Sequence, residues 1–233
     1  MPSRIEAILL DAGNTLVFLD GRRMRTLFAD AGVRVSQDRF AKAELRARAE
    51  LVDSMNGGST GLEPAAWKRY FRRIFRGSGV PWWRMPRVAR ALKEAHSLIE
   101  FWSHVDEETP AALQRVLDDG YRLAVISNAD GSMEGLLETV GLRPYFEFVL
   151  DSGTVAWEKP DPRIFQEGVG RLGVEPHEAL YVGDLYHVDV LGARAAGMEA
   201  VLLDPLDRLA HDVDRIPSVS HLPEYLAGRS SSV

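Results

Sequence analysis

The sequence of 233 residues contains no cysteine. Without thiols it can form no disulfide, use no thiolate nucleophile and hold no cysteine-ligated zinc, so any bound metal must be held mainly by oxygen. The chain also has no apolar run approaching the roughly 18 residues that a membrane helix needs. Its N-terminus lacks the basic, apolar and small-residue pattern of a signal peptide. We therefore expect a cytoplasmic protein with no membrane partner.

Positive charge is scarce overall but concentrated in one segment. The formal net charge is -6, yet residues 18–106 hold 17 Lys and Arg against 10 Asp and Glu, a balance of +7. The remainder holds 11 basic and 24 acidic residues, a balance of -13. The basic residues are scattered, which argues against a nucleic-acid partner. Either they decorate solvated helix faces, or the basic segment helps to attract an anionic substrate.

Apolar residues in the basic segment recur at helical spacing, which places them on one face of a helix. We predict that they form the core of a helical subdomain, interrupted by a glycine-rich loop at residues 56–61. The residues concerned are Met24, Leu27 and Phe28, followed by the aromatic set Trp67, Tyr70, Phe71 and Phe75.

Strand-like and helical patterns alternate after Thr109. Such alternation is typical of parallel strands joined by crossover helices, and it predicts an α/β fold with a doubly wound parallel sheet. The last residues, from Arg229 to Val233, are expected to be a frayed tail. The predicted strands are residues 6–10, 121–126, 146–150, 179–182 and 200–203, and the predicted helices are residues 113–117, 131–140, 162–172 and 188–196.

Polar residues directly follow three of these strands. Asp11 ends the first, Ser127 and Asn128 end the second, and Asp184 follows the fourth. In open parallel sheets, ligands bind beyond the carboxyl ends of the strands, so these groups would converge although they are distant in the sequence. A single strand-end Asp is commonly only a helix cap. Three such groups together predict a functional site.

Four short motifs around these residues resemble those of the haloacid dehalogenase-like (HAD) hydrolase superfamily, in the subfamily with a helical cap of the C1 type. They are Asp11 with Thr15 and Leu16, Ser127, Lys159 with Pro160, and Gly183–Asp184 followed by Asp189, in the family's order across essentially the whole chain.

The resemblance implies a Rossmann-like core formed by residues 1–17 and 107–233. It also implies an inserted α-helical cap at residues 18–106, which would close over the strand ends, exclude water and select the substrate. Residues 56–61, the pair Trp82 and Trp83, and the cap arginines are where that selection is expected. The two tryptophans could equally be packing residues.

The resemblance also implies a role for each motif residue. Asp11 would be the nucleophile that attacks phosphorus and forms an aspartyl-phosphate, which water then hydrolyses. Ser127, Asn128 and Lys159 would bind the phosphoryl group, and Ser127 and Lys159 would also act in catalysis. Asp189 would be a further catalytic residue that holds metal-bound water or Lys159. The implied cofactor is Mg²⁺, with the Asp11 carboxylate, the Gly13 main-chain carbonyl and the Asp184 carboxylate as its ligands.

Gly13 stands where the phosphatases of this superfamily usually carry a second Asp, which protonates the leaving alcohol and then activates water. Such acid/base groups typically contribute about 10² to 10⁴ in rate, so alkyl phosphates should react slowly. An aryl or acyl phosphate, with a good leaving group, would need little protonation. Alternatively His187, Asp20 or His104 supplies the proton. Asn14 occupies the family's usual glycine position, and Asn tolerates a left-handed backbone.

A third explanation of Gly13 is different chemistry, since the superfamily's dehalogenases also lack the second Asp and displace halide from carbon without a metal. This chain retains Gly183, Asp184 and Asp189, a costly cluster of negative charge unless a cation neutralises it. We therefore predict a Mg²⁺-dependent phosphatase that acts on a small phosphorylated metabolite. The alternatives left open are a 2-haloacid dehalogenase-like hydrolase and a low-activity module that binds a phosphorylated ligand or a protein. The sequence indicates no oligomeric state.

Overall fold

The computed structural model describes residues 4–56, 64–94, 101–205 and 212–230. Contacts within the chain divide it into two units. One unit combines Met1–Phe18 with Val105–Val233, and the other is Leu19–His104. The first unit contains the sheet and the second is helical.

The first unit is built on a parallel sheet of six strands. The strand order is β3-β2-β1-β4-β5-β6, and every neighbouring pair is parallel. This arrangement confirms the predicted α/β class with a doubly wound sheet. The strands are β1 Ala7–Leu10, β2 Arg122–Ser127, β3 Val149–Asp151, β4 Ala179–Gly183, β5 Glu199–Leu203 and β6 Asp214–Ile216.

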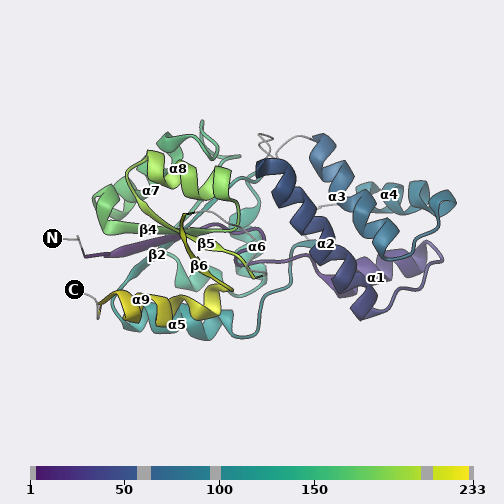
Figure 1. Cartoon of the computed structure of the whole chain (residues 1–233), viewed down its shortest axis with the longest axis horizontal. Helices are drawn as coiled ribbons and strands as arrows, with labels where there is room; N and C mark the ends of the chain where they lie inside the picture. Colours follow the sequence, from purple (N-terminus) through teal and green to yellow (C-terminus); the bar gives the residue numbers. More distant parts are fainter. Residues whose placement is uncertain (1–3, 57–63, 95–100, 206–211, 231–233) are drawn as a thin grey trace. The chain divides into compact units, whose positions relative to one another are not determined.

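Helices cover both faces of this sheet. Figure 1 shows α7 (Pro162–Leu172) and α8 (Leu191–Ala195) on one face, with α5 (Thr109–Asp118) and α9 (Leu222–Ser230) on the other. All four residues of β1 are buried, as expected for a central strand that is covered on both sides. The sheet is therefore anchored by apolar contact on both faces, and its loops are left to carry polar groups.

Helix α7 shows how local sequence sets the boundaries of an element. The side chain of Asp161 caps its N-terminus by accepting a hydrogen bond from the Arg163 amide, and Pro162 takes the first helical position. The helix ends at Gly173, which has the left-handed φ of 66° that glycine adopts without strain. Its buried side chains include Ile164, Phe165 and Val169. The predicted range of 162–172 matches the observed helix.

The C-terminal part differs from the prediction. Strand β6 and helix α9 were not predicted, and Arg229 of the predicted frayed tail lies in α9, where it pairs with Glu199 of β5. Residues 231–233 of that tail lie outside the described part of the chain. The region predicted as one helix over residues 188–196 is a π-helical turn, Tyr186–Val190, followed by α8. Short elements such as β6 are fixed by pairing with a neighbouring strand, which the local sequence pattern does not record.

The second unit contains the helices α1 Gly21–Asp30, α2 Gln37–Asn56, α3 Pro64–Gly77 and α4 Met85–Glu94. Met24, Leu27 and Phe28 are buried on one face of α1, as their spacing predicted. Phe28 packs edge-on against Phe75, and the remaining aromatic residues of α3 contact one another, so the aromatic set is a packing core. Among the described residues, no helix combines the length and hydrophobicity required to cross a bilayer.

Helix α9 should be an integral part of the fold, because Leu226 is only 2% exposed. We expect Leu226→Ala to lower the free energy of unfolding by about 2–5 kcal/mol, the usual cost of removing a buried leucine side chain. The matched control is Leu191→Ala, which changes a leucine that is 38% exposed and should cost less than about 0.5 kcal/mol. Urea unfolding of both variants measures the difference, and equal costs would contradict the packing of α9.

Candidate active site

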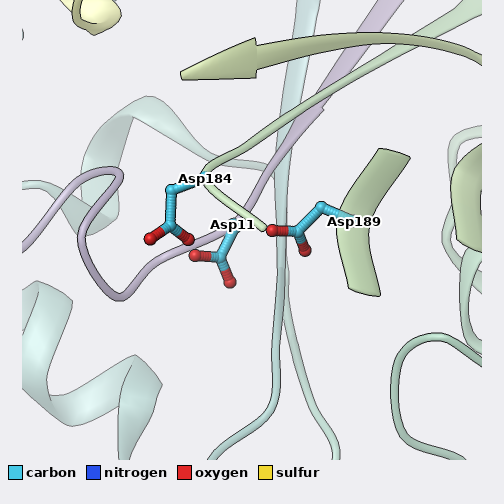
Figure 2. Close-up of side chains that lie close together, drawn as sticks. All are labelled: Asp11, Asp184 and Asp189. Carbon is cyan, nitrogen blue, oxygen red and sulfur yellow. The ribbon is translucent and has the colours of Figure 1, made fainter. Parts of the chain in front are cut away.

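Three acids from two distant parts of the sequence meet at the carboxyl edge of the sheet. Asp11 directly follows β1, Asp184 directly follows β4, and Asp189 lies in the π-helical turn beyond it. One carboxylate oxygen of each residue lies within 4.8 Å of those of the other two, and Figure 2 shows the three carboxyl groups close together. All three residues are buried. The parallel pairing of β1 with β4 accounts for this meeting, since it aligns the two strand ends.

Lys159 supplies a buried cation to these acids. It precedes α7, and its side chain is 2% exposed. Its Nζ donates hydrogen bonds to Asp11 Oδ1 at 2.6 Å, to Asp189 Oδ1 at 2.8 Å and to the Tyr181 hydroxyl at 2.9 Å. An ammonium group has three N–H donors, so these three bonds use all of them.

Asn128 holds the backbone of Lys159 in place. Its Nδ2 donates to the Lys159 carbonyl at 2.8 Å, and its Oδ1 accepts from the Lys159 amide at 2.8 Å. The neighbouring Ser127 is the last residue of β2 and is buried. The loop after β2 therefore fixes the loop that carries the lysine, a role the sequence did not suggest for Asn128. Binding of a phosphoryl group by Ser127 and Asn128 stays a prediction.

Asp189 is held against the backbone that leads out of β4. Its Oδ2 accepts from the Leu185 amide at 2.9 Å. A Cβ added at Gly183 would lie 2.5 Å from the Asp189 carboxyl carbon, so only glycine allows the carboxyl group to approach this closely. The Gly183–Asp184 pair thus has two functions: the glycine makes room for Asp189, and the aspartate joins the cluster.

Burial and the neighbouring charges together set the pKa values in the cluster. Burial raises the pKa of Asp11 to about 6, an effect that Lys159 opposes and Asp189 reinforces. Burial alone would lower the pKa of Lys159, but the carboxylates of Asp11 and Asp189 raise it well above its usual value. Burial is therefore the main cause of the raised pKa at Asp11, whereas attraction to the two carboxylates is the cause at Lys159.

The donor set fits a divalent cation with hard-oxygen preference. Three ionised carboxylates and one ammonium give these four side chains a summed charge of -2. Mg²⁺ would balance that charge, and carboxylate and carbonyl oxygens are the ligands it prefers. Lys159 bonds to both Asp11 and Asp189, and the Leu185 amide also bonds to Asp189. Asp11 and Asp184 as the carboxylate ligands of the metal stay a prediction.

The loop after β1 is a compact turn in which glycine is not a conformational requirement. Gly13 has no left-handed φ, and a Cβ added there would meet nothing within 4 Å. Asn14 has the positive φ of 58°, which confirms the expectation of a left-handed backbone at that residue. The Asn14 amide donates to the Val17 carbonyl at 2.8 Å and closes the turn. A ligand role of the Gly13 carbonyl stays a prediction.

Two residues of the site make contacts that were not predicted from the sequence. Tyr181 of β4 binds the Nζ of Lys159, and the Thr15 hydroxyl donates to Asp11 Oδ2 at 3.3 Å. The sequence indicated Thr15 only as part of a motif, without a contact to Asp11. The available signal for Tyr181 was its hydroxyl within an otherwise apolar buried strand, because a buried tyrosine normally has a hydrogen-bond partner.

The three residues that were predicted as alternative proton donors lie in different parts of the chain. Asp20 caps helix α1, where its side chain accepts from the Arg22 and Arg23 amides. His104 is exposed and belongs to the helical unit, whereas His187 lies edge-on to Tyr186 in the π-helical turn. None of the three is a member of the acidic cluster found among the described residues.

The predicted specificity elements fare differently. Trp82 and Trp83 are 76% and 64% exposed, so they are not core packing residues. Residues 57–61 of the predicted glycine-rich loop lie outside the described part of the chain.

A buried aspartate, a lysine and further acids thus lie together at the carboxyl edge of a parallel sheet, the edge at which open α/β folds bind their ligands. The model of the haloacid dehalogenase-like hydrolase family matches residues 5–197, and the chain belongs to this family. This result confirms the resemblance inferred from the four motifs.

Individual relatives agree with this assignment. The haloacid dehalogenase-like hydrolase domain-containing protein 3 of Mus musculus is 42% identical over 164 residues, which cover 67% of this chain and 65% of that protein. A phosphoserine phosphatase of Thermus thermophilus is 39% identical over 147 residues, 62% of this chain and 59% of that protein. The match thus spans less than two thirds of either relative. The HAD-hydrolase YfnB of Bacillus subtilis, solved bound to magnesium, has a TM-score of 0.69 at 17% identity and covers 96% of this chain and 99% of that chain, which shows the fold.

Removal of one acid should weaken metal binding. We expect Asp184→Asn to reduce the affinity for Mg²⁺ by about tenfold or more, because it removes one negative charge from the cluster. A loss of about 1.4 kcal/mol in binding free energy is enough for a tenfold change. Isothermal titration calorimetry measures the affinity. The control is Asp214→Asn, which changes an acid bonded to Tyr225 outside the cluster and should leave Mg²⁺ binding unchanged. Equal affinity of the wild type and Asp184→Asn would contradict a metal site at Asp184.

Proposed function

We propose that this chain is a Mg²⁺-dependent phosphatase that acts on a small phosphorylated metabolite through an aspartyl-phosphate on Asp11. The observation that carries the proposal is the buried cluster of three carboxylates and one ammonium, with its summed charge of -2. A buried charge of this size needs a cation, and a phosphate substrate is the anion that such a cation would bring to Asp11. Similarity to a phosphoserine phosphatase supports this class of substrate.

In the first step, a carboxylate oxygen of Asp11 forms a bond to phosphorus while the bond from phosphorus to the leaving oxygen breaks. In the second step, water attacks the phosphorus of the aspartyl-phosphate, releases inorganic phosphate and restores the carboxylate. Thr15 orients Asp11 by donating to its second carboxylate oxygen.

The remaining residues neutralise and position charge. Lys159 lies against Asp11 and would face the phosphoryl oxygens, and Ser127 at the end of β2 would donate to them. The Asp11 and Asp184 carboxylates and the Gly13 carbonyl would hold Mg²⁺, which supplies charge neutralisation for the approach of an anionic nucleophile to an anionic substrate. Asp189 keeps Lys159 in place.

Gly13 narrows the class of substrate. With no carboxylic acid at this position, the leaving oxygen must depart with little help from the protein. Acyl and aryl phosphates have leaving groups that are stable without immediate protonation. They are the substrates for which the loss of an acid at residue 13 costs least.

In this proposal the helical unit Leu19–His104 is the cap that selects the substrate. Its excess of basic residues favours an anionic ligand. A dehalogenase would use the same aspartate without a metal and would leave the charge of -2 uncompensated, which is why the phosphatase is preferred.

Loss of the nucleophile tests the proposal directly. We expect Asp11→Asn to abolish Mg²⁺-dependent hydrolysis of para-nitrophenyl phosphate and acetyl phosphate, whereas Asp214→Asn should retain it. Phosphate release measures the activity. Chloride release from 2-chloropropionate without metal, with no hydrolysis of any phosphate, would establish the dehalogenase instead. Binding of phosphorylated ligands without turnover would establish a binding module.

Gly13→Asp should restore the missing acid. The side chain has room, since a Cβ at this position meets nothing within 4 Å and the backbone is not left-handed. We expect kcat/KM on alkyl phosphates to rise by about tenfold or more, with a smaller change on acetyl phosphate, because only the poor leaving group needs the proton. Gly13→Asn is the matched control, since it adds the same bulk without an acid. Equal rates of the two variants would show that the missing proton is not the limitation.

A further inference from the structure

Tyr181 reaches across the central strand of the sheet. It lies in β4 opposite Leu9 of β1, and Leu9 is in turn opposite Ala124 of β2. Its hydroxyl bonds to the carbonyl of Ile126, two residues further along β2, at 3.1 Å. The side chain therefore passes over β1 and connects the two strands on either side of it. Its ring packs edge-on against Phe165 of α7, with ring centroids 4.9 Å apart.

The direction of the two hydrogen bonds of Tyr181 follows from the chemistry of its partners. An ammonium can only donate, so the Tyr181 oxygen accepts from Lys159 Nζ at 2.9 Å. A carbonyl can only accept, so the hydroxyl proton points to Ile126. Burial raises the pKa of Tyr181 well above its usual value, which keeps that proton in place. The hydroxyl is thus a fixed acceptor for the lysine.

This acceptor completes the surroundings of the lysine. Two of the three Nζ donors go to Asp11 and Asp189, and the third goes to Tyr181, the one neutral partner. Without the hydroxyl, one N–H would lack an acceptor in a buried place, and the ammonium would reorient to find one. The contact to Ile126 also ties the lysine to the residue that precedes Ser127.

We infer that Tyr181 is a positioning residue that fixes Lys159 between Asp11 and Asp189 and links it to the strand end that carries Ser127. The inference rests on the proposed function, in which Lys159 contacts the phosphoryl group of the substrate. Tyr181 touches no reacting atom and acts through the lysine.

The first test is the crystal structure of Tyr181→Phe, which keeps the ring and removes the hydroxyl. We expect the Nζ of Lys159 to move out of hydrogen-bond distance of Asp11 or Asp189. A water in place of the hydroxyl, with the lysine unmoved, would overturn the inference. This readout needs no activity, so it still decides the matter if the wild type hydrolyses no phosphate and the proposed function fails.

The second test is kinetic. For Tyr181→Phe on acetyl phosphate we expect kcat to fall by about 10- to 100-fold, as is typical when a supporting partner of a site residue is lost. KM should change by less than about threefold, because Tyr181 itself touches no part of the substrate. Tyr225→Phe is the matched control, since it removes a tyrosine hydroxyl bonded to Asp214 in the same unit and should leave kcat unchanged. An unchanged kcat in Tyr181→Phe would overturn the inference.

A double-mutant cycle separates positioning from general destabilisation. In the background of Lys159→Met, which keeps most of the length of the side chain but removes its charge, Tyr181→Phe should cause no further loss of kcat. A loss of the same size in both backgrounds would show that Tyr181 acts on stability and not through the lysine. If Lys159→Met does not fold, the structure of Tyr181→Phe and its kcat and KM values decide whether Tyr181 positions the lysine or only stabilises the fold.

Discussion

The site depends on one buried ammonium shared by two carboxylates. Each of the three N–H donors of Lys159 has an acceptor, and its ammonium forms ion pairs with both Asp11 and Asp189. Removing one partner of a buried ion pair commonly costs about 3–5 kcal/mol, because the other charge is left uncompensated. The arrangement is therefore both the electrostatic centre of the site and a contact between loops that lie 148 residues apart in the sequence.

The sheet makes this contact possible, and the loops make it accurate. Parallel pairing brings the ends of β1, β2 and β4 to one edge, which places Asp11, Ser127 and Asp184 near one another without any specific contact between them. The amide of Asn128 then fixes the backbone of Lys159, and Gly183 leaves the space that Asp189 fills. The sheet topology thus brings the strand ends together, and these local contacts then fix the positions of the side chains.

The sequence predicted those parts of the molecule that local rules control. Helix α7 was found at its observed bounds because an Asp cap, a Pro at the first position and a final Gly all act locally. The meeting of Asp11 and Asp184 followed from the strand-end rule, whereas β6, α9 and the π-helical turn depend on packing against distant residues. The role of Tyr181 was not predicted because it too depends on residues that are distant in the sequence. Its position in a buried strand was clear, but only the register of β4 against β1 shows that its hydroxyl meets Lys159.

The turn after β1 separates two requirements of phosphoryl transfer. The loop shape is kept by Asn14, and the backbone at Gly13 would accept a side chain, so the glycine serves no structural need among the described contacts. Under the proposed function, what the glycine changes is proton transfer to the leaving group. A factor of about 10² to 10⁴ corresponds to roughly 3–5 kcal/mol of barrier. Under the proposed function that amount would come from the leaving group itself, and the acidity of the leaving group would distinguish good substrates from poor ones.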